Sequence, residues 1–179
     1  ARAREFDVVL VSDQAETAAG GVVTPAVRDA LARLAASDPR QVIWVDSRKR
    51  PEHFREVIVK SNADEAQEAC LRLFGRMDLE ALRKHVGARP MFVTQGARGV
   101  LIVADGGERL VAARSVERPV DICGAGDSFS AGAALAYRVT GSAVEAGRLG
   151  NLVASVTIMK KGTGTASPAE ILAAAGEEA

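Results

Sequence analysis

The sequence predicts an α/β fold with a mostly parallel central sheet. Short apolar runs alternate with helical stretches as far as Thr94, and such alternation is typical of strand–helix–strand units. Several of these runs end in a polar or acidic residue, as buried parallel strands do when they present side chains at their carboxyl ends. After Val120 the pattern is nearly all helical.

Six segments are expected to be strands. The runs that should form the parallel sheet are residues 6–12, 41–46, 57–60 and 90–94. The segments 100–104 and 109–113 are expected to form a β-hairpin around Asp105-Gly106-Gly107-Glu108. Asp-Gly and Gly-Gly favour that turn because glycine adopts positive φ angles without steric cost.

The helices are predicted from their caps and periodicity. Thr24 as N-cap, with Pro25 in the first turn, favours a helix over residues 26–36. Asn62 and Asp78 are the N-caps expected for the next two helices, and the later helices should cover 125–137, 142–159 and 168–175. No repeat or Pro-, Gly- or Ser-rich linker divides the chain, so residues 1–179 are predicted to be a single domain.

Composition argues against several classes of partner. Lys and Arg together number 23, as do Asp and Glu, so no net charge attracts nucleic acid or an anionic membrane. No apolar run is long enough to span a bilayer, and the first residues lack an apolar signal core. Cys70 and Cys123 suggest neither a disulfide framework nor metal-ligand spacing. We expect a cytoplasmic protein, with the loop arginines Arg48 and Arg50 mainly solvated.

The stretch from Asp121 to Gly132 carries the clearest chemical signal. Gly124 and Gly126 flank Ala125 just before a helix, and Asp127 falls in the first turn of that helix. Amides exposed by glycine at a helix N-terminus form an anion site, and a nearby carboxylate can accept a proton from an attacking hydroxyl. This is the minimum machinery for phosphoryl transfer to an alcohol. On these residues alone, a tight turn with no catalytic role remains an open alternative.

Four blocks in order resemble the ribokinase-like (PfkB) carbohydrate kinases. Residues 121–133 resemble the C-terminal signature, whose pattern is Asp-Thr-x-Gly-Ala-Gly-Asp before a small-residue helix. Residues 62–65 resemble the family's Asn-x-x-Glu, and residues 94–99 its Thr-x-Gly-x-x-Gly turn. Asn151 and the segment 161–163 resemble its adenine-side wall and last cation-site loop.

The resemblance implies a three-layer α/β/α ribokinase-like fold of which this chain is the C-terminal portion. The glycine-rich N-terminal lid region of the family is absent from the sequence, so we expect a fragment of a longer kinase, and a partner that supplies the missing half is the alternative. That region supplies most sugar contacts in the family, and its absence leaves the sugar unidentified. It also leaves open whether a full-length protein is a homodimer.

The family's chemistry can be carried over to matching residues. Asp127 would be the general base, and the amides of Gly124, Ala125 and Gly126 would stabilise charge on the transferred phosphoryl group. Asp121 and nearby carbonyls would hold a monovalent cation, with K⁺ as the candidate.

The remaining blocks would bind the nucleotide and magnesium. Asn62 and Glu65 would position hydrated Mg²⁺, although the same pair also fits a helix capping box. The residues expected to contact ATP are Thr94, Gly96, Gly99, Asn151 and Gly162. For the first two of these, a plain strand-to-turn transition is the alternative.

The sequence therefore predicts an ATP-dependent carbohydrate kinase acting on a small sugar or sugar phosphate. Three other functions remain in competition: a nucleotide-binding module that is inactive in this truncated form, a vitamin or nucleoside kinase, and an oxidoreductase that binds a dinucleotide. The last is disfavoured because the glycines do not follow the first strand with Gly-x-Gly-x-x-Gly spacing.

Overall fold

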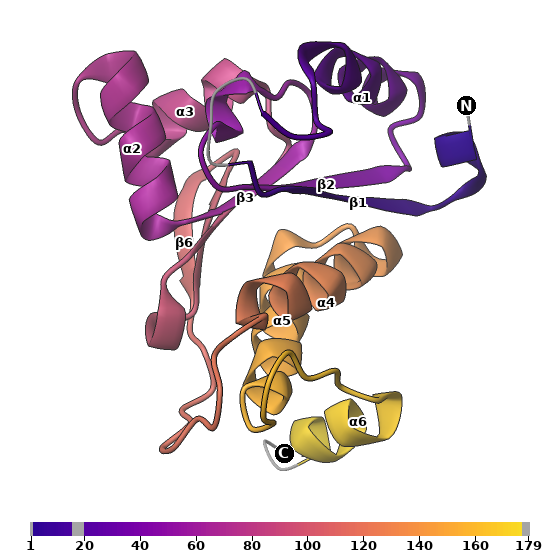
Figure 1. The fold of residues 1–179 in the computed structure, drawn as a ribbon, viewed down its shortest axis with the longest axis vertical. Helices are drawn as coiled ribbons and strands as arrows, with labels where there is room; N and C mark the ends of the chain where they lie inside the picture. The colour runs from indigo at the N-terminus through magenta and orange to yellow at the C-terminus, as the bar shows by residue number, and fades with distance from the viewer. Residues whose placement is uncertain (1, 16–19, 177–179) are drawn as a thin grey trace. The chain divides into compact units, whose positions relative to one another are not determined.

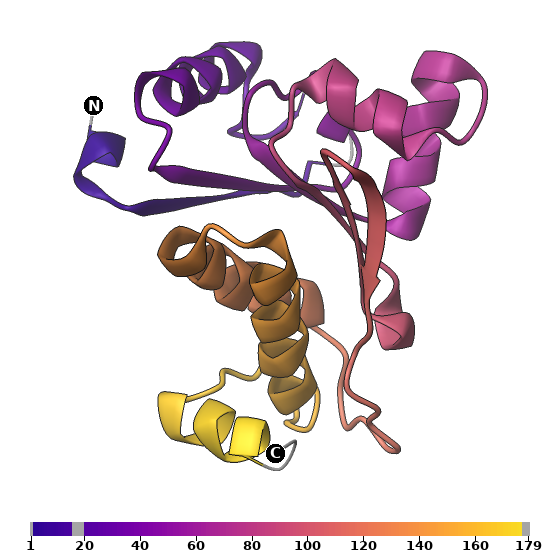
Figure 2. The same ribbon diagram turned by 180° about the vertical axis from the view of Figure 1, so that it is seen from behind.

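A computed structural model describes residues 2–15 and 20–176, and its ribbon is drawn in Figures 1 and 2. The strands of the described chain are β1 (Val8–Asp13), β2 (Val42–Ser47), β3 (Ile58–Asn62), β4 (Met91–Thr94), β5 (Val100–Ala104) and β6 (Gly107–Val111). The α-helices are α1 (Pro25–Ser37), α2 (Ala63–Phe74), α3 (Leu79–Val86), α4 (Ala125–Thr140), α5 (Ala143–Thr157) and α6 (Pro168–Gly176). Three short 3₁₀ helices, which the sequence did not predict, are η1 (Arg2–Glu5), η2 (Pro51–His53) and η3 (Gly96–Arg98).

The chain divides into two compact units. Unit 1 consists of Ala1–Gln95 with Leu101–Arg109, and unit 2 of Gly96–Val100 with Leu110–Ala179. The prediction that residues 1–179 form a single domain stays a prediction.

The sheet has the order β1-β2-β3-β4-β5-β6, and its first four strands pair in parallel. The register aligns Asp13 with Ser47 at the end of β1 and β2, and Asn62 with Thr94 at the end of β3 and β4. Polar residues at the ends of these strands therefore share one edge of the sheet, as the sequence predicted. Ligands of open α/β proteins bind at this edge.

The core of unit 1 lies on the face of the sheet that α1, α2 and α3 cover (Figures 1 and 2). Alternate residues of the strands point to this face because the side-chain period of a strand is two. Val45, Val59 and Val93 are almost completely buried there. The opposite face carries Trp44 and Phe92, whose ring centroids lie 4.7 Å apart.

The predicted helix starts of unit 1 are confirmed, because each cap side chain accepts a backbone N–H of the first turn. Thr24 Oγ1 accepts from Val27 at 3.3 Å, and Asp78 Oδ1 accepts from Ala81 at 2.9 Å. Asn62 forms a full capping box with Glu65. Such caps satisfy amides that have no partner inside the helix.

The hairpin is confirmed, but its turn is shorter than predicted. Strand β6 begins at Gly107 rather than Arg109, so Asp105-Gly106 alone connects the two strands. Gly106 and Gly107 have φ angles of 101° and 107°. The sequence could not place the turn because either Asp-Gly or Gly-Gly satisfies the same backbone requirement.

Unit 2 is built mainly from α4, α5 and α6. Helix α5 ends at Thr157, two residues before the predicted end, and the carbonyl of Ile158 accepts hydrogen bonds from Val120 and Asp121. Helices α4 and α5 approach closely through glycines: a Cβ on Gly150 would lie 2.6 Å from Cε2 of Phe129. None of the helices in the described part of the chain is long and apolar enough to cross a membrane.

Candidate functional site

The glycine loop before α4 forms a tight turn at the start of the helix. Gly124 is the N-cap of α4, with φ 77° and ψ 5° in the left-handed region. The amide of Ala125 donates to the carbonyl of Ile122 at 3.2 Å, which closes a turn, and Ser128 N donates to Gly124 O at 2.9 Å. Amides of a first helical turn have no partner inside the helix. Those of Gly126 and Asp127 occupy such positions.

Asp127 is the third residue of α4, and its side chain is exposed. It therefore lies in the same turn as the amides of the glycine loop. A carboxylate in this position is within reach of a group held by those amides.

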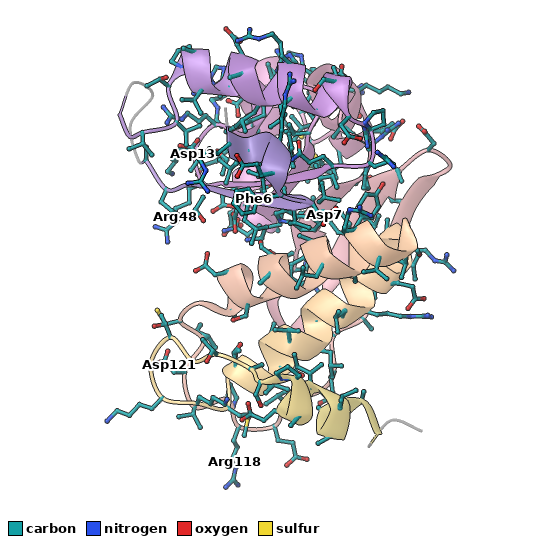
Figure 3. The ribbon with its side chains drawn as sticks, turned by 90° about the vertical axis from the view of Figure 1, so that its right-hand side faces the viewer. Phe6, Asp7, Asp13, Arg48, Arg118 and Asp121 are labelled. Carbon is teal, nitrogen blue, oxygen red and sulfur yellow. The ribbon has the colours of Figure 1, made fainter. Side chains whose placement is uncertain are left out.

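Asp121 and Gly162 lie together in unit 2. The Asp121 carboxylate accepts the amide of Cys123 at 2.9 Å through Oδ1 and the amide of Gly162 at 3.1 Å through Oδ2. Gly162 has a φ of 75°. Figure 3 labels Asp121 in the loop that precedes α4. The sequence blocks 121–133 and 161–163, which are far apart in the chain, are thus in direct contact.

Gly99 and Asn151 both contact the backbone at the end of β6. A Cβ on Gly99 would lie 2.2 Å from the carbonyl oxygen of Val111, so no larger residue fits without movement of that backbone. The buried side chain of Asn151 donates to the carbonyls of Val111 and Ala112 at 3.0 and 3.1 Å. Gly96, which begins η3, has a φ of 58° and accepts the amide of Gly99 at 3.0 Å.

In unit 1, Asn62, Glu65 and Thr94 lie together at the ends of β3 and β4. Asn62 Oδ1 accepts the amide of Glu65 at 2.8 Å, and Glu65 Oε2 accepts the amide of Asn62 at 2.7 Å. Thr94 pairs with Asn62 in the sheet register, and its hydroxyl donates to the carbonyl of Ser61 at 3.4 Å. The capping-box alternative for Asn62 and Glu65 is therefore confirmed, and it leaves Oε1 of Glu65 outside the box.

Burial raises the pKa of Glu65, and the amide of Asn62 and the charge of Lys60 oppose that rise. Lys60 forms a buried ion pair with Asp46, with Nζ 2.8 Å from Oδ2. Asp46 is the acidic end of the predicted strand 41–46, but its pairing with Lys60 was not predicted. The signal was a lysine that directly follows the apolar residues 57–59 within a strand, since a buried charge requires a partner.

The expectation that Arg50 is solvated is wrong. Its side chain is 4% exposed and pairs with Asp13, which is 1% exposed. Arg50 Nε and Nη2 donate to the two carboxylate oxygens at 2.9 and 2.8 Å, and Ser47 Oγ donates to Asp13 Oδ2 at 2.9 Å. Arg50 also donates to the carbonyl of Gly20 at 2.8 Å. Arg48 is exposed, and its backbone amide donates to the carbonyl of Asp13 at 3.2 Å; Figure 3 labels both residues.

The candidate site residues thus form two sets, one in each unit. Unit 1 holds Asn62, Glu65 and Thr94, and unit 2 holds the glycine loop, Asp127, Asp121, Gly162, Gly96, Gly99 and Asn151. Among residues 2–15 and 20–176, no group of three or more His, Cys, Asp or Glu side chains is placed to hold a metal ion. Magnesium commonly keeps several waters and needs few protein ligands, so Asn62 and Glu65 fit a hydrated ion rather than a closed cage.

A parallel sheet with polar strand ends, together with a glycine-capped helix that carries an aspartate in its first turn, is typical of α/β proteins that bind phosphate groups. A profile of the pfkB family carbohydrate kinases matches residues 18–170. The chain therefore belongs to this family of kinases.

Curated relatives include bacterial proteins named bifunctional protein HldE. The protein from Caulobacter vibrioides is 30% identical, and the match covers 97% of this chain and 37% of the relative. That from Gluconacetobacter diazotrophicus is 32% identical over 93% of this chain and 35% of the relative. The chain thus spans little more than a third of the length of these relatives.

Solved structures show that the fold is ribokinase-like. Ribokinase from Thermotoga maritima superposes with a TM-score of 0.75 at 19% identity, covering 96% of this chain and 57% of that protein. Arabidopsis thaliana ribokinase, solved with ribose and ATP, has a TM-score of 0.72 at 20% identity. The match covers 96% of this chain and 56% of that protein. A fructokinase from Vibrio cholerae, solved with fructose, ADP and calcium, has a TM-score of 0.64 at 20% identity. The match covers 93% of this chain and 59% of that protein.

Proposed function

We propose that this chain is the nucleotide-binding and catalytic part of an ATP-dependent carbohydrate kinase. The observation that carries the proposal is the start of α4, where Gly124 adopts the left-handed conformation and Asp127 lies in the first turn. Membership of the pfkB family supports the same chemistry. The acceptor would be a hydroxyl of a small sugar or sugar phosphate.

Asp127 would accept the proton of that hydroxyl as its oxygen attacks the γ-phosphorus of ATP. The bond from the γ-phosphorus to the bridging oxygen breaks, and ADP leaves with the electron pair. The amides of the Gly124-Ala125-Gly126 loop would stabilise the charge on the transferred group, and such preorganised donors contribute about 3 kcal/mol each. Because Ala125 N already donates to Ile122 O, Gly124 and Gly126 are the stronger candidates.

Thr94, Gly96 and Gly99 would line the nucleotide phosphates, Asn151 would border the adenine side, and Gly162 would contact the nucleotide from the cation-site loop. Gly99 and Asn151 would act through the β6 backbone that both contact. The tight approach of Gly99 to Val111 and the two bonds from Asn151 hold that backbone in place.

Asn62 and Glu65 would hold Mg²⁺ through bound water, using the oxygen chemistry that this cation prefers. Bound magnesium would neutralise charge on the ATP phosphates. Asp121 and carbonyls near it would take a monovalent cation, with K⁺ as the candidate.

Two alternatives are each favoured by one observation. The chain spans little more than a third of its curated relatives, which favours a nucleotide-binding module that is inactive without the rest of a longer protein. A nucleoside kinase of the same fold is favoured by the nucleoside kinase from Burkholderia thailandensis, which was solved with inosine and superposes with a TM-score of 0.72 at 21% identity.

Calorimetric titration with ADP and with a non-hydrolysable ATP analogue, in magnesium and potassium, tests the proposal. We expect micromolar to low-millimolar affinity that survives Asp127→Asn, because a base for the acceptor hydroxyl does not bind the nucleotide. Gly124→Ala should weaken binding. Gly141→Ala is its matched control, since Gly141 is the left-handed C-cap of the same helix, with a φ of 66° and no neighbour that a Cβ would meet. Absence of binding at millimolar nucleotide would contradict the proposal.

A further inference from the structure

The Asp121 carboxylate bridges two backbone segments that are forty residues apart in the chain. One oxygen accepts the amide of Cys123 at 2.9 Å, in the loop that leads into α4. The other accepts the amide of Gly162 at 3.1 Å, in the segment that follows α5. Hydrogen bonds to an ionised acceptor are roughly twice as strong as those between neutral groups.

Two backbone hydrogen bonds join the same two segments. The amides of Val120 and Asp121 both donate to the carbonyl of Ile158, at 2.8 and 3.1 Å. The side chains of Val120 and Ile122 are 58% and 72% exposed. Apolar burial of these side chains therefore does little to fix the loop, whereas hydrogen bonds join it to the segment 158–162.

The segment after α5 is itself anchored, so it can serve as a support. Lys160 Nζ lies 2.7 Å from Glu170 Oε1 and also donates to the carbonyl of Thr165 at 2.5 Å. Glu170 Oε2 accepts the amide and the hydroxyl of Ser167, each at 2.8 Å, at the start of α6. Polar contacts therefore join the segment 158–162 both to the start of α6 and to the loop before α4.

We propose that Asp121 is a positioning residue that aligns the Gly124 and Gly126 amides by clamping their loop to the segment 158–162. The inference rests on the proposed function, in which those amides stabilise charge on the transferred phosphoryl group. The clamp works through N–H donors, so it operates with no monovalent cation bound. It therefore assigns Asp121 a role beyond that of a cation ligand.

The first test measures hydrogen exchange of the Cys123 and Gly162 amides by NMR, with tetramethylammonium as the sole monovalent cation. Asp121→Asn keeps the size of the side chain but removes the charge and one acceptor. We expect exchange at one or both amides to become about tenfold faster or more, the range given by the loss of a charged hydrogen bond. Glu117→Gln, an exposed carboxylate of the same loop, should leave both amides unchanged.

The second test measures steady-state phosphoryl transfer by the longest natural form of the protein, with and without K⁺. Because the amides stabilise charge in the transition state, Asp121→Asn should lower kcat with little change in the KM for ATP, in either salt. A merely structural role would instead lower the melting temperature without lowering kcat selectively relative to the KM for ATP.

Several outcomes would overturn the inference. Unchanged exchange in Asp121→Asn would show that the carboxylate does not hold the loop. An effect seen only with K⁺ would assign Asp121 to cation binding alone. Faster exchange with an unchanged kcat would remove the positioning role. Absence of phosphoryl transfer by the wild-type protein would contradict both the proposed function and the positioning role. The hydrogen-exchange result would still show whether Asp121 holds the loop.

Discussion

The two units hold their shares of the candidate site by different means. Unit 1 uses buried charge, in the ion pairs of Arg50 with Asp13 and of Lys60 with Asp46. Unit 2 uses small residues and backbone contacts, with Gly150 packed against Phe129 and Asp121 bonded to two amides. Unit 1 should therefore be sensitive to lost charge, and unit 2 to added volume.

The largest effect is expected in unit 1 from Arg50→Met, which leaves Asp13 buried without its cation. Breaking a buried pair in this way costs about 3–5 kcal/mol of unfolding free energy. Urea denaturation, followed by the fluorescence of the single tryptophan, Trp44, measures the loss. Arg40→Met is the control, because that side chain is 86% exposed, and it should stay within about 0.5 kcal/mol of wild type. Equal effects at the two positions would contradict the role of buried charge.

Unit 2 should respond most to Gly150→Ala. The added Cβ would lie 2.6 Å from Cε2 of Phe129 and 3.0 Å from its carbonyl oxygen, and overpacking of this kind costs about 1–3 kcal/mol. Thermal unfolding followed by circular dichroism tests the prediction. Gly176→Ala provides the control, since no atom lies within 4 Å of its added Cβ. If Gly150→Ala were as stable as this control, close helix contact would not be the basis of unit 2.

A smaller effect is expected at the start of α2. Asn62→Ala removes the cap that accepts the Glu65 amide at 2.8 Å, and such a loss costs about 1 kcal/mol. Asn62→Ser should recover most of the stability because serine is also a good N-cap. Urea unfolding of the two variants makes the comparison. A serine variant as unstable as the alanine variant would show that the side chain does more than cap the helix.

The smallest effects are expected in the pH dependence of stability, to which one carboxyl group in each unit contributes with opposite sign. Lys160 and Ser167 lower the pKa of Glu170 to about 2, so its stabilising contribution is present above the unfolded value of 4.5 and is lost as the pH falls towards 2. Burial raises the pKa of Glu65 above 4.5, so stability is lost as the pH rises from 4.5 through that raised value. At neutral pH, Glu170→Gln should destabilise the protein and Glu65→Gln should not. NMR titration of the two carboxyl groups would contradict this account if the shifts had the opposite signs.

Local features were predictable from the sequence, whereas long-range partners were not. Thr24, Asn62 and Asp78 act on amides three residues away, so their residue types predicted the helix starts. The turn before α4 was also predictable, because Gly124 and Gly126 lie next to the helix start in the sequence. Arg50 was misjudged because its partner, Asp13, lies 37 positions earlier in the chain. The approach of Gly150 to Phe129 depends on how two helices pack, which no local pattern specifies.

The most direct test of the central claim is ATP-dependent phosphorylation of a panel of sugars, sugar phosphates and nucleosides by the longest natural form of the protein, before and after Asp127→Asn. If Asp127 is the base, kcat should fall by about 100- to 10,000-fold, while the affinity for nucleotide stays near that of the wild type. An Asp127→Asn enzyme that retains wild-type turnover would contradict the assignment of Asp127 and, with it, the proposed mechanism.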